Sequence, residues 1–121
     1  MKVAGFGFRG AATPDALQDA LIAAGGAAGL TALATAADKA TAPVFAALSR
    51  TLNLPVLAVG LPALRATPAT PSGHAPARYG RHSLAEAAAL AAAGPGARLT
   101  GPRAVSACGT ATCAIAERST P

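Results

Sequence analysis

Alanine is the feature that most constrains how this chain folds, because it accounts for 36 of the 121 residues. The larger apolar types, Leu, Val, Ile and Phe, together supply only 23 residues. Each small side chain buries little apolar area, and burial stabilises by roughly 25 cal/mol per Å². Stability must therefore come from close approach of the backbones or from a bound partner. Charged residues make up 12% of the chain, which argues against disorder. The composition also excludes a disulfide scaffold, collagen and a heptad coiled coil.

The first half of the sequence alternates between predicted strands and predicted helices. Apolar runs between turn-forming residues predict strands at residues 2–8, 30–35 and 56–59. One helix starts at Thr13-Pro14, an N-cap followed by proline in the first turn, and ends at Gly25. A second helix starts at Thr41 and ends at Asn53. This alternation favours an α/β domain whose first three strands are parallel and joined by right-handed crossovers.

The second half of the sequence predicts a loop-rich stretch, one further helix and two further strands. Prolines are frequent in residues 61–82, so we expect a loop there with one short helical turn near Leu64. Ser83 and Glu86 form a capping box ahead of the helix. The last two strands, an antiparallel pair, are expected at residues 97–100 and 111–117. The sequence thus predicts a single three-layer α/β domain over residues 1–121, with a mixed five-stranded sheet whose first strands are parallel.

The formal net charge is +5, from 8 Arg, 2 Lys and 5 acidic residues. A basic chain suits an anionic partner, which on charge alone is nucleic acid, anionic lipid, or a polycarboxylate or phosphate ligand. Residues 74–82 are the densest basic stretch, but Tyr79 is the only aromatic residue there, so no base-stacking platform is predicted. Residues 20–37 are uncharged, yet they are mostly Ala, Gly and Thr, which argues against a membrane span. No signal peptide is predicted.

The cysteine and histidine residues predict no metal site. Cys108 and Cys113 are five residues apart in a segment interpreted as strand-like, so their side chains should project from opposite faces. They can then neither bond to each other nor chelate one metal ion, and we expect free, packed thiols in a reducing cytoplasm. His74 and His82 have no Cys or acidic residue at a ligand spacing.

The segment from Gly5 to Gly10 matches the G-x-G-x-x-G pattern of dinucleotide-binding loops. The third glycine of that pattern normally lies in the opening of a helix, whereas here the helix starts three residues later. The segment also carries two bulky residues, Phe6 and Phe8. A strand that runs on to Phe8, with both rings on one face and Arg9 at its carboxyl edge, is the simpler interpretation.

Two other loops carry groups that suit ligand binding. Asp38 and Lys39 follow the second predicted strand, at the carboxyl edge where open α/β sheets bind ligands. They could serve proton transfer and anion binding, or they could be an ordinary exposed pair. The Thr70-Pro71-Ser72 segment offers hydroxyl and N–H groups to an anion, or forms a plain turn.

Taken in order, these segments resemble the CobE / CbiG C-terminal domain family of cobalamin biosynthesis. The matching segments are residues 3–9, 35–40, 70–72, 83–90 and 112–116. The resemblance implies a cytoplasmic α/β protein that acts on corrin-ring intermediates without a cofactor. In longer relatives this domain is the C-terminal part of a hydrolase that opens the ring lactone of a cobalt-precorrin and releases a two-carbon aldehyde. The chain looks like the stand-alone form associated with the aerobic route.

The resemblance also implies a ligand site on three loops. The implied ligand-binding residues are Gly5, Gly7, Phe8, Arg9, Thr35, Lys39, Pro71 and Ser72. Arg9 would hold a carboxylate through two parallel hydrogen bonds, and Lys39 would act as a point charge. Gly5 and Gly7 would let the backbone approach a flat ring.

The resemblance leaves three functions to distinguish. We expect a protein that binds a precorrin intermediate and has no membrane or nucleic-acid partner. Other cobalamin-pathway enzymes and a second copy of the chain, in a homodimer, are the candidate protein partners. The first alternative is a lactone-opening hydrolase, similar to a cobalt-precorrin-5A hydrolase, in which Asp38 and Lys39 are catalytic and Asp38 activates a water or orients Lys39. The further alternative is a small basic nucleic-acid-binding protein that uses residues 74–82.

Overall fold

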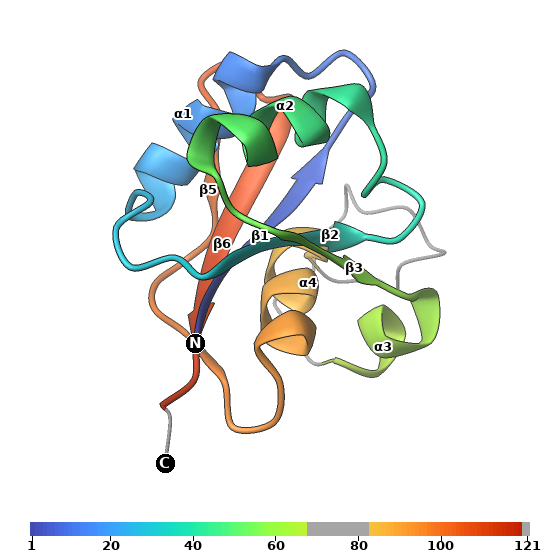
Figure 1. Cartoon of the computed structure of the whole chain (residues 1–121), viewed down its shortest axis with the longest axis vertical. Helices are drawn as coiled ribbons and strands as arrows, with labels where there is room; N and C mark the ends of the chain where they lie inside the picture. The colour runs from blue at the N-terminus through green and yellow to red at the C-terminus, as the bar shows by residue number, and fades with distance from the viewer. Residues whose placement is uncertain (68–82, 120–121) are drawn as a thin grey trace.

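The computed structural model describes residues 1–67 and 83–119, and within them a mixed sheet lies between two layers of helices (Figure 1). The strand order is β3-β2-β1-β6-β4, and β5 also pairs with β6. The strands are β1 (Lys2–Phe8), β2 (Ala32–Ala36), β3 (Val56–Val59), β4 (Arg98–Leu99), β5 (Ala104–Val105) and β6 (Ala111–Glu117). The helices are α1 (Pro14–Ala24), α2 (Pro43–Leu52), α3 (Leu61–Ala66) and α4 (Leu84–Ala93).

The sheet has the predicted mixed character. Strands β1, β2 and β3 are parallel, and β6 runs antiparallel to β1 along its whole length. The described residues form six strands and not the predicted five, because residues 104–105 form the short strand β5 where a loop was expected. Strand β2 covers residues 32–36, shifted from the predicted 30–35. Both differences concern short segments, in which alternation of apolar residues carries little information.

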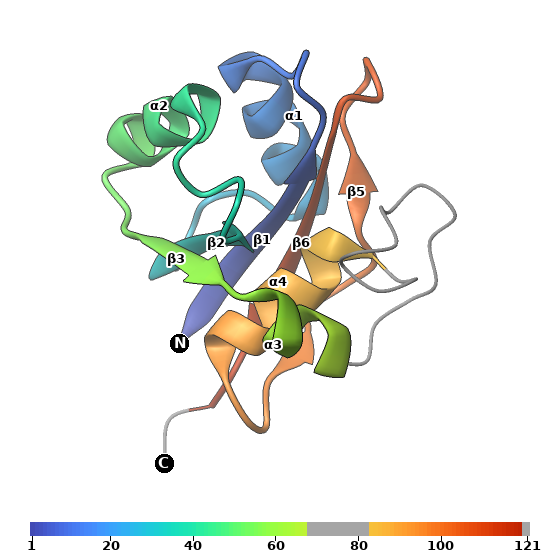
Figure 2. The same ribbon diagram turned by 90° about the vertical axis from the view of Figure 1, so that its right-hand side faces the viewer.

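Helices α1 and α2 cover one face of the sheet, and aromatic rings fill the space beneath them (Figures 1 and 2). Phe45 of α2 lies edge-on to Phe6, with 5.5 Å between ring centroids, and is stacked with Phe8 at 5.7 Å. The predicted placement of Phe6 and Phe8 on one face of β1 is therefore confirmed. Helix α1 begins as predicted, since the Thr13 hydroxyl accepts a hydrogen bond from the Ala16 N–H at 3.1 Å.

Helices α3 and α4 cover the other face, where the core consists mainly of alanine. Gly5 of β1 lies directly beneath α4 and is buried. A Cβ atom at Gly5 would overlap the carbonyl oxygen of Ala85 and would lie 2.5 Å from the backbone nitrogen of Ala89. The close approach of backbones that the alanine-rich composition requires is therefore realised between β1 and α4.

We predict that Gly5→Ala destabilises the fold by about 1–3 kcal/mol, the usual range for forcing an extra methyl group into a packed core. The added atom meets the backbone of α4 and the Cβ atom of Ala89, none of which can rotate away, so α4 must move away from β1. Gly7→Ala is the matched control, because its Cβ atom would meet Leu84 at an ordinary 3.5 Å. Urea unfolding should place the two variants well apart, and equal midpoints for Gly5→Ala and the parent protein would contradict the packing argument.

The two cysteines are both free thiols, as expected, but only one of them is packed. Cys113 lies in β6 and is buried, whereas Cys108 is exposed in the turn between β5 and β6. The expectation of a packed, strand-borne thiol is therefore wrong for Cys108, because Gly109, with a φ of 76°, turns the chain before β6 starts. Hydrogen bonds from the hydroxyls of Ser106 and Thr110 lower the pKa of Cys108 to about 7. Burial raises the pKa of Cys113.

We predict that iodoacetamide alkylates Cys108 with a midpoint near pH 7, because the thiolate is the reactive form. Cys113 should react only after unfolding. Thr110→Val removes one stabilising hydroxyl, 3.0 Å from the sulfur, and should move the midpoint up toward the ordinary value of 9.0. Mass spectrometry of protein quenched at a series of pH values measures this, and a parent midpoint near 9 would rule out the proposed hydrogen-bond effect.

Candidate functional site

The candidate site is the edge of the sheet where the parallel strands end and the helices begin. The chain leaves β1 at Phe8 and β2 at Ala36, and α1 and α2 start shortly afterwards. Helix α4 also begins here, since Gly7 near the end of β1 lies beside Leu84, the first residue of α4. Open α/β sheets bind ligands at this carboxyl edge because loops from several strands meet there.

Arg9 is the first residue after β1 and is exposed at this edge. Its backbone is fixed on both sides: its N–H donates to the Thr110 carbonyl at 2.9 Å, and its carbonyl accepts from the Ala12 N–H at 3.0 Å. Within the described part of the chain, its guanidinium makes no hydrogen bond or ion pair. The structure thus presents a positive charge on a rigid backbone with its donors available to a ligand.

Lys39 joins the loop after β2 to the end of β1. Its ammonium donates a hydrogen bond to the Phe8 carbonyl at 2.8 Å and lies 5.0 Å from the centroid of the Phe8 ring. The backbone of the loop is held by a bond from the Lys39 N–H to the Ala36 carbonyl at 2.9 Å. Because an ammonium has three donors, this arrangement brings a second positive charge to the peptide group that joins Phe8 to Arg9, with donors to spare.

The structure places three other predicted site residues within the packed interior or beside it. The Thr35 side chain is fully buried, and its hydroxyl donates to the Phe6 carbonyl at 2.8 Å. Gly5 is covered by α4, and the Phe8 ring belongs to the aromatic core. We therefore leave Thr35 and Gly5 out of the proposed site, and we assign the Phe8 carbonyl, rather than its ring, to the site.

The remaining predicted residues are divided between the edge and the part of the chain outside the described residues. Asp38 is exposed in the turn that follows β2, next to Lys39. Gly7 is half-buried against the start of α4. Pro71 and Ser72 lie outside the described residues, as does the basic stretch at 74–82. The structure thus brings Arg9, Lys39 and Asp38 to one edge.

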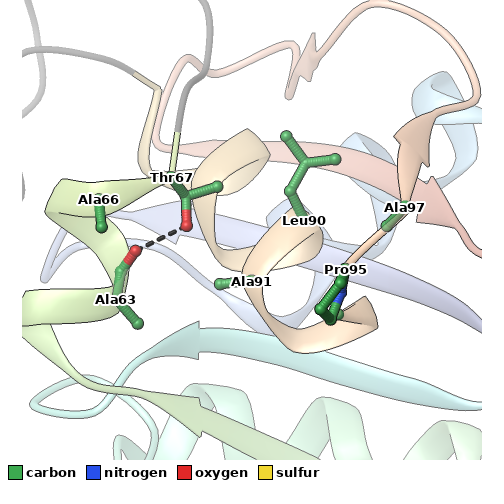
Figure 3. Close-up of a pocket in the computed structure, with 8 residues that line it drawn as sticks. Ala63, Ala66, Thr67, Leu90, Ala91, Pro95 and Ala97 are labelled. Atoms are coloured by element: carbon green, nitrogen blue, oxygen red, sulfur yellow. Dashed lines mark hydrogen bonds between the residues drawn. The ribbon is translucent and has the colours of Figure 1, made fainter.

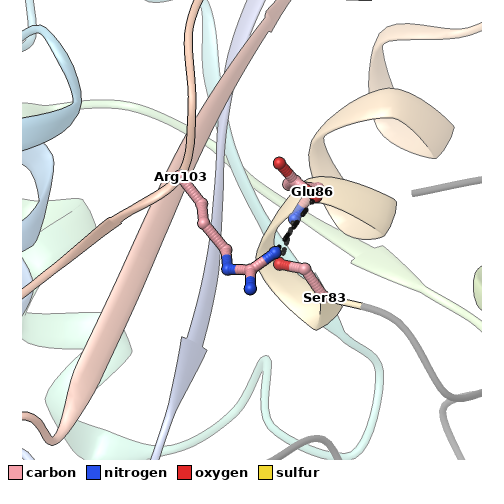
Figure 4. Close-up of polar contacts among 3 residues, drawn as sticks. All are labelled: Ser83, Glu86 and Arg103. Atoms are coloured by element: carbon pink, nitrogen blue, oxygen red, sulfur yellow. Dashed lines mark hydrogen bonds and ion pairs between the residues drawn. The ribbon is translucent and has the colours of Figure 1, made fainter. Parts of the chain in front are cut away.

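Sequence reasoning missed an ion pair on the α4 side of the same region. The capping box is confirmed in one direction, since the Glu86 N–H donates to the Ser83 hydroxyl at 3.3 Å. The Glu86 carboxylate is turned toward Arg103, with its Oε1 atom 3.7 Å from Nη1 of that residue (Figure 4). No local pattern relates Glu86 to Arg103, because their proximity depends on the path of the chain between β4 and β5.

An open apolar groove of about 550 Å³ lies between α3 and α4, away from Arg9 and Lys39 (Figure 3). Among the described residues, its walls come from α3, the second half of α4 and the turn that follows α4; half of these residues are alanine and none is charged. Thr67 closes one side through a hydrogen bond of 2.6 Å to the Ala63 carbonyl. The groove therefore offers no recognition of an anion, and we place the candidate site at the edge that bears Arg9.

The described residues contain no cluster of three or more His, Cys, Asp or Glu that could hold a metal ion. None of the helices in this part of the chain is long and apolar enough to cross a bilayer. The side chains that the structure presents at the edge are Arg9, Lys39 and Asp38, and the two cations among them can bind carboxylates or phosphates.

Comparison with known proteins identifies the family. The family model described as "Cobalamin synthesis G C-terminus" matches residues 2–116. The solved structure of CobE, a protein from the cobalamin (vitamin B12) biosynthetic pathway, is 31% identical with a TM-score of 0.80, covering 100% of this chain and 92% of that chain. Cobalamin biosynthesis protein chiG from Agrobacterium tumefaciens str. C58 is 39% identical with a TM-score of 0.73, covering 99% and 100%. No curated protein sequence matches significantly.

The family match runs through β1, the edge with Arg9 and Lys39, the ion pair of α4 and almost all of β6. The two solved structures repeat the same fold over practically the full chain. This protein therefore belongs to the cobalamin synthesis G C-terminal family, the family of CobE and CbiG cobalamin biosynthesis proteins.

Proposed function

We propose that this protein binds a precorrin, a corrin-ring intermediate of cobalamin biosynthesis, through the carboxylates on the periphery of the ring. The observation that carries the proposal is the meeting of Arg9 and Lys39 at the carboxyl edge, where the Lys39 ammonium bonds to the carbonyl next to Arg9. A precorrin carries several carboxylates, so a site with two positive side chains at one edge of the sheet matches its chemistry.

Arg9 and Lys39 would recognise the ligand in different ways. The Arg9 guanidinium is exposed and has a planar set of donors that fits one carboxylate through two parallel hydrogen bonds. Lys39 is half-buried and held at the Phe8 carbonyl and ring, so its charge stays at a defined point. Because the fold already orders Lys39 and the backbone of Arg9, the main conformational entropy lost on binding is that of the Arg9 side chain.

Binding without chemical change is favoured over hydrolysis by the state of Lys39. A hydrolase that used this residue would need its amine free to exchange a proton with the substrate. Here one N–H of the ammonium is already engaged by the Phe8 carbonyl at 2.8 Å. Its neighbour Asp38 is exposed to water, whereas water-activating carboxylates work best in a secluded site.

We predict that Arg9→Ala weakens precorrin binding about tenfold or more, since a hydrogen bond to a charged group contributes about 1.5–3 kcal/mol. The fold should be unaffected, because Arg9 holds the loop through its backbone only. Arg50→Ala is the matched control: Arg50 is exposed in the last turn of α2, at the other end of that helix, and its loss changes the net charge equally. Absorbance titration of purified precorrins measures both affinities.

Two results of that titration would contradict the placement of the ligand site at Arg9. Arg9→Ala binding as tightly as the parent would show that the ligand lies elsewhere. An equal loss for Arg9→Ala and Arg50→Ala would show attraction by net charge alone. Mass spectrometry of the recovered ligand then distinguishes binding, with unchanged mass, from hydrolysis, with loss of a two-carbon fragment. Failure to bind any tetrapyrrole, together with salt-sensitive RNA binding, would overturn both corrin functions.

A further inference from the structure

Helix α4 carries a single charged residue, Glu86, among alanines and leucines. The side chain of Glu86 is only 3% exposed. Removing an ionised carboxylate from water is costly unless another charge or several hydrogen bonds compensate. Packing α4 against Gly5 needs only small residues, so the charge at position 86 serves a purpose other than filling space.

One compensating charge is Arg103, in the connection between β4 and β5 (Figure 4). Nη1 of Arg103 lies 3.7 Å from Oε1 of Glu86, which is longer than an N–H···O hydrogen bond. The pair is thus held by charge attraction, and no other described residue accepts a hydrogen bond from the guanidinium. With 30% of its side chain exposed, Arg103 keeps a planar set of donors that can reach a second anion.

The strand register places Arg103 two strands from β1 and about level with Gly5, since Ala104 pairs with Cys113 and Cys113 pairs with Phe6. Val105 of β5 pairs with Thr112 of β6, and Thr112 pairs with Gly7 near the end of β1. Adjacent strands lie about 4.8 Å apart, so the connection that carries Arg103 runs two strands away from β1. Arg103 faces α4, whereas Lys39 lies over the Phe8 ring on the face that α2 covers. Lys39 at the end of β1 and Arg103 level with its middle therefore lie on opposite faces of the sheet.

We propose that Arg103 is a second carboxylate-binding residue of the precorrin site and that Glu86 is the positioning residue that aims it. The inference rests on the proposed function and specifies the ligand class further. A ligand that contacts Arg9 and Arg103 together must be wide enough to reach around β6 and must carry carboxylates on separate parts of its periphery. The site then selects a ring-sized polycarboxylate over a small acid or a compound with one carboxylate.

The test is a double-mutant cycle on precorrin affinity, with uroporphyrin as a stable tetrapyrrole polycarboxylate probed in parallel. Arg103→Ala should weaken binding about tenfold, and Arg103→Lys should restore only part of the loss, because an ammonium lacks the planar donor set. Glu86→Gln should weaken binding several-fold. The double variant should bind no worse than Arg103→Ala alone, since Glu86 acts through Arg103. Arg98→Ala, an exposed arginine on β4, is the control for net charge.

The outcomes separate this inference from the proposed function. If the parent binds, Arg9→Ala weakens binding and Arg103→Ala stays within twofold of the parent, the second binding point is wrong and the function stands. If the effects of Glu86→Gln and Arg103→Ala multiply, Glu86 does not position Arg103. If the parent binds neither precorrins nor uroporphyrin, the proposed function falls, and this inference with it. Circular dichroism checks folding, and Arg103→Lys against the parent decides the case should Arg103→Ala fail to fold.

Discussion

The contact between Gly5 and α4 is the constraint on which the rest of the structure depends. The backbone of α4 occupies the volume that a side chain at residue 5 would fill. This contact sets how close α4 lies to the sheet, and it sets where the first turn of α4 lies along β1, next to Gly7. The position of Glu86 in that first turn, and hence its pairing with Arg103, follows from the same contact. In this alanine-rich chain, the missing side chain at Gly5 is thus the main feature that fixes the position of α4 on the sheet.

The two faces of the sheet differ in the size of the side chains that pack against them. The alanine face gives close approach but little apolar area, while the opposite face gathers all three phenylalanines, Phe6, Phe8 and Phe45. Phe8 is the last residue of β1, so the stacked pair it forms with Phe45 anchors the strand where it reaches the candidate site. Lys39 then uses both the ring and the carbonyl of Phe8. The large side chains are concentrated where the fold must hold a charged loop in place.

The starts of α1 and α4 could be predicted from the sequence because their signals are local, whereas α2 was expected to start at Thr41 and is capped by Ala42 without a side-chain hydrogen bond. Thr13 and Ser83 cap α1 and α4 through hydrogen bonds to residues three positions ahead. Strand β5 could not be predicted, since its two residues are defined only by pairing with β6. The loops with Arg9 and Lys39 could be located, because the ends of parallel strands meet at one edge. The burial of Thr35 could not, because its hydroxyl partner, the Phe6 carbonyl, is 29 residues away in the chain.

A thin core and a charged edge have a common consequence for ligand binding. The alanine face contributes less burial per residue than a core of large side chains does, so a ligand that contacts several elements adds a relatively large share of the stability by mass action. The loop after β1, the loop after β2 and the connection before β5 each contribute one cation and are separate in sequence. An anion bound across them links β1, β2 and β6 through contacts that the small side chains cannot supply. The same composition that forces α4 against Gly5 therefore favours a ligand broad enough to bridge these loops.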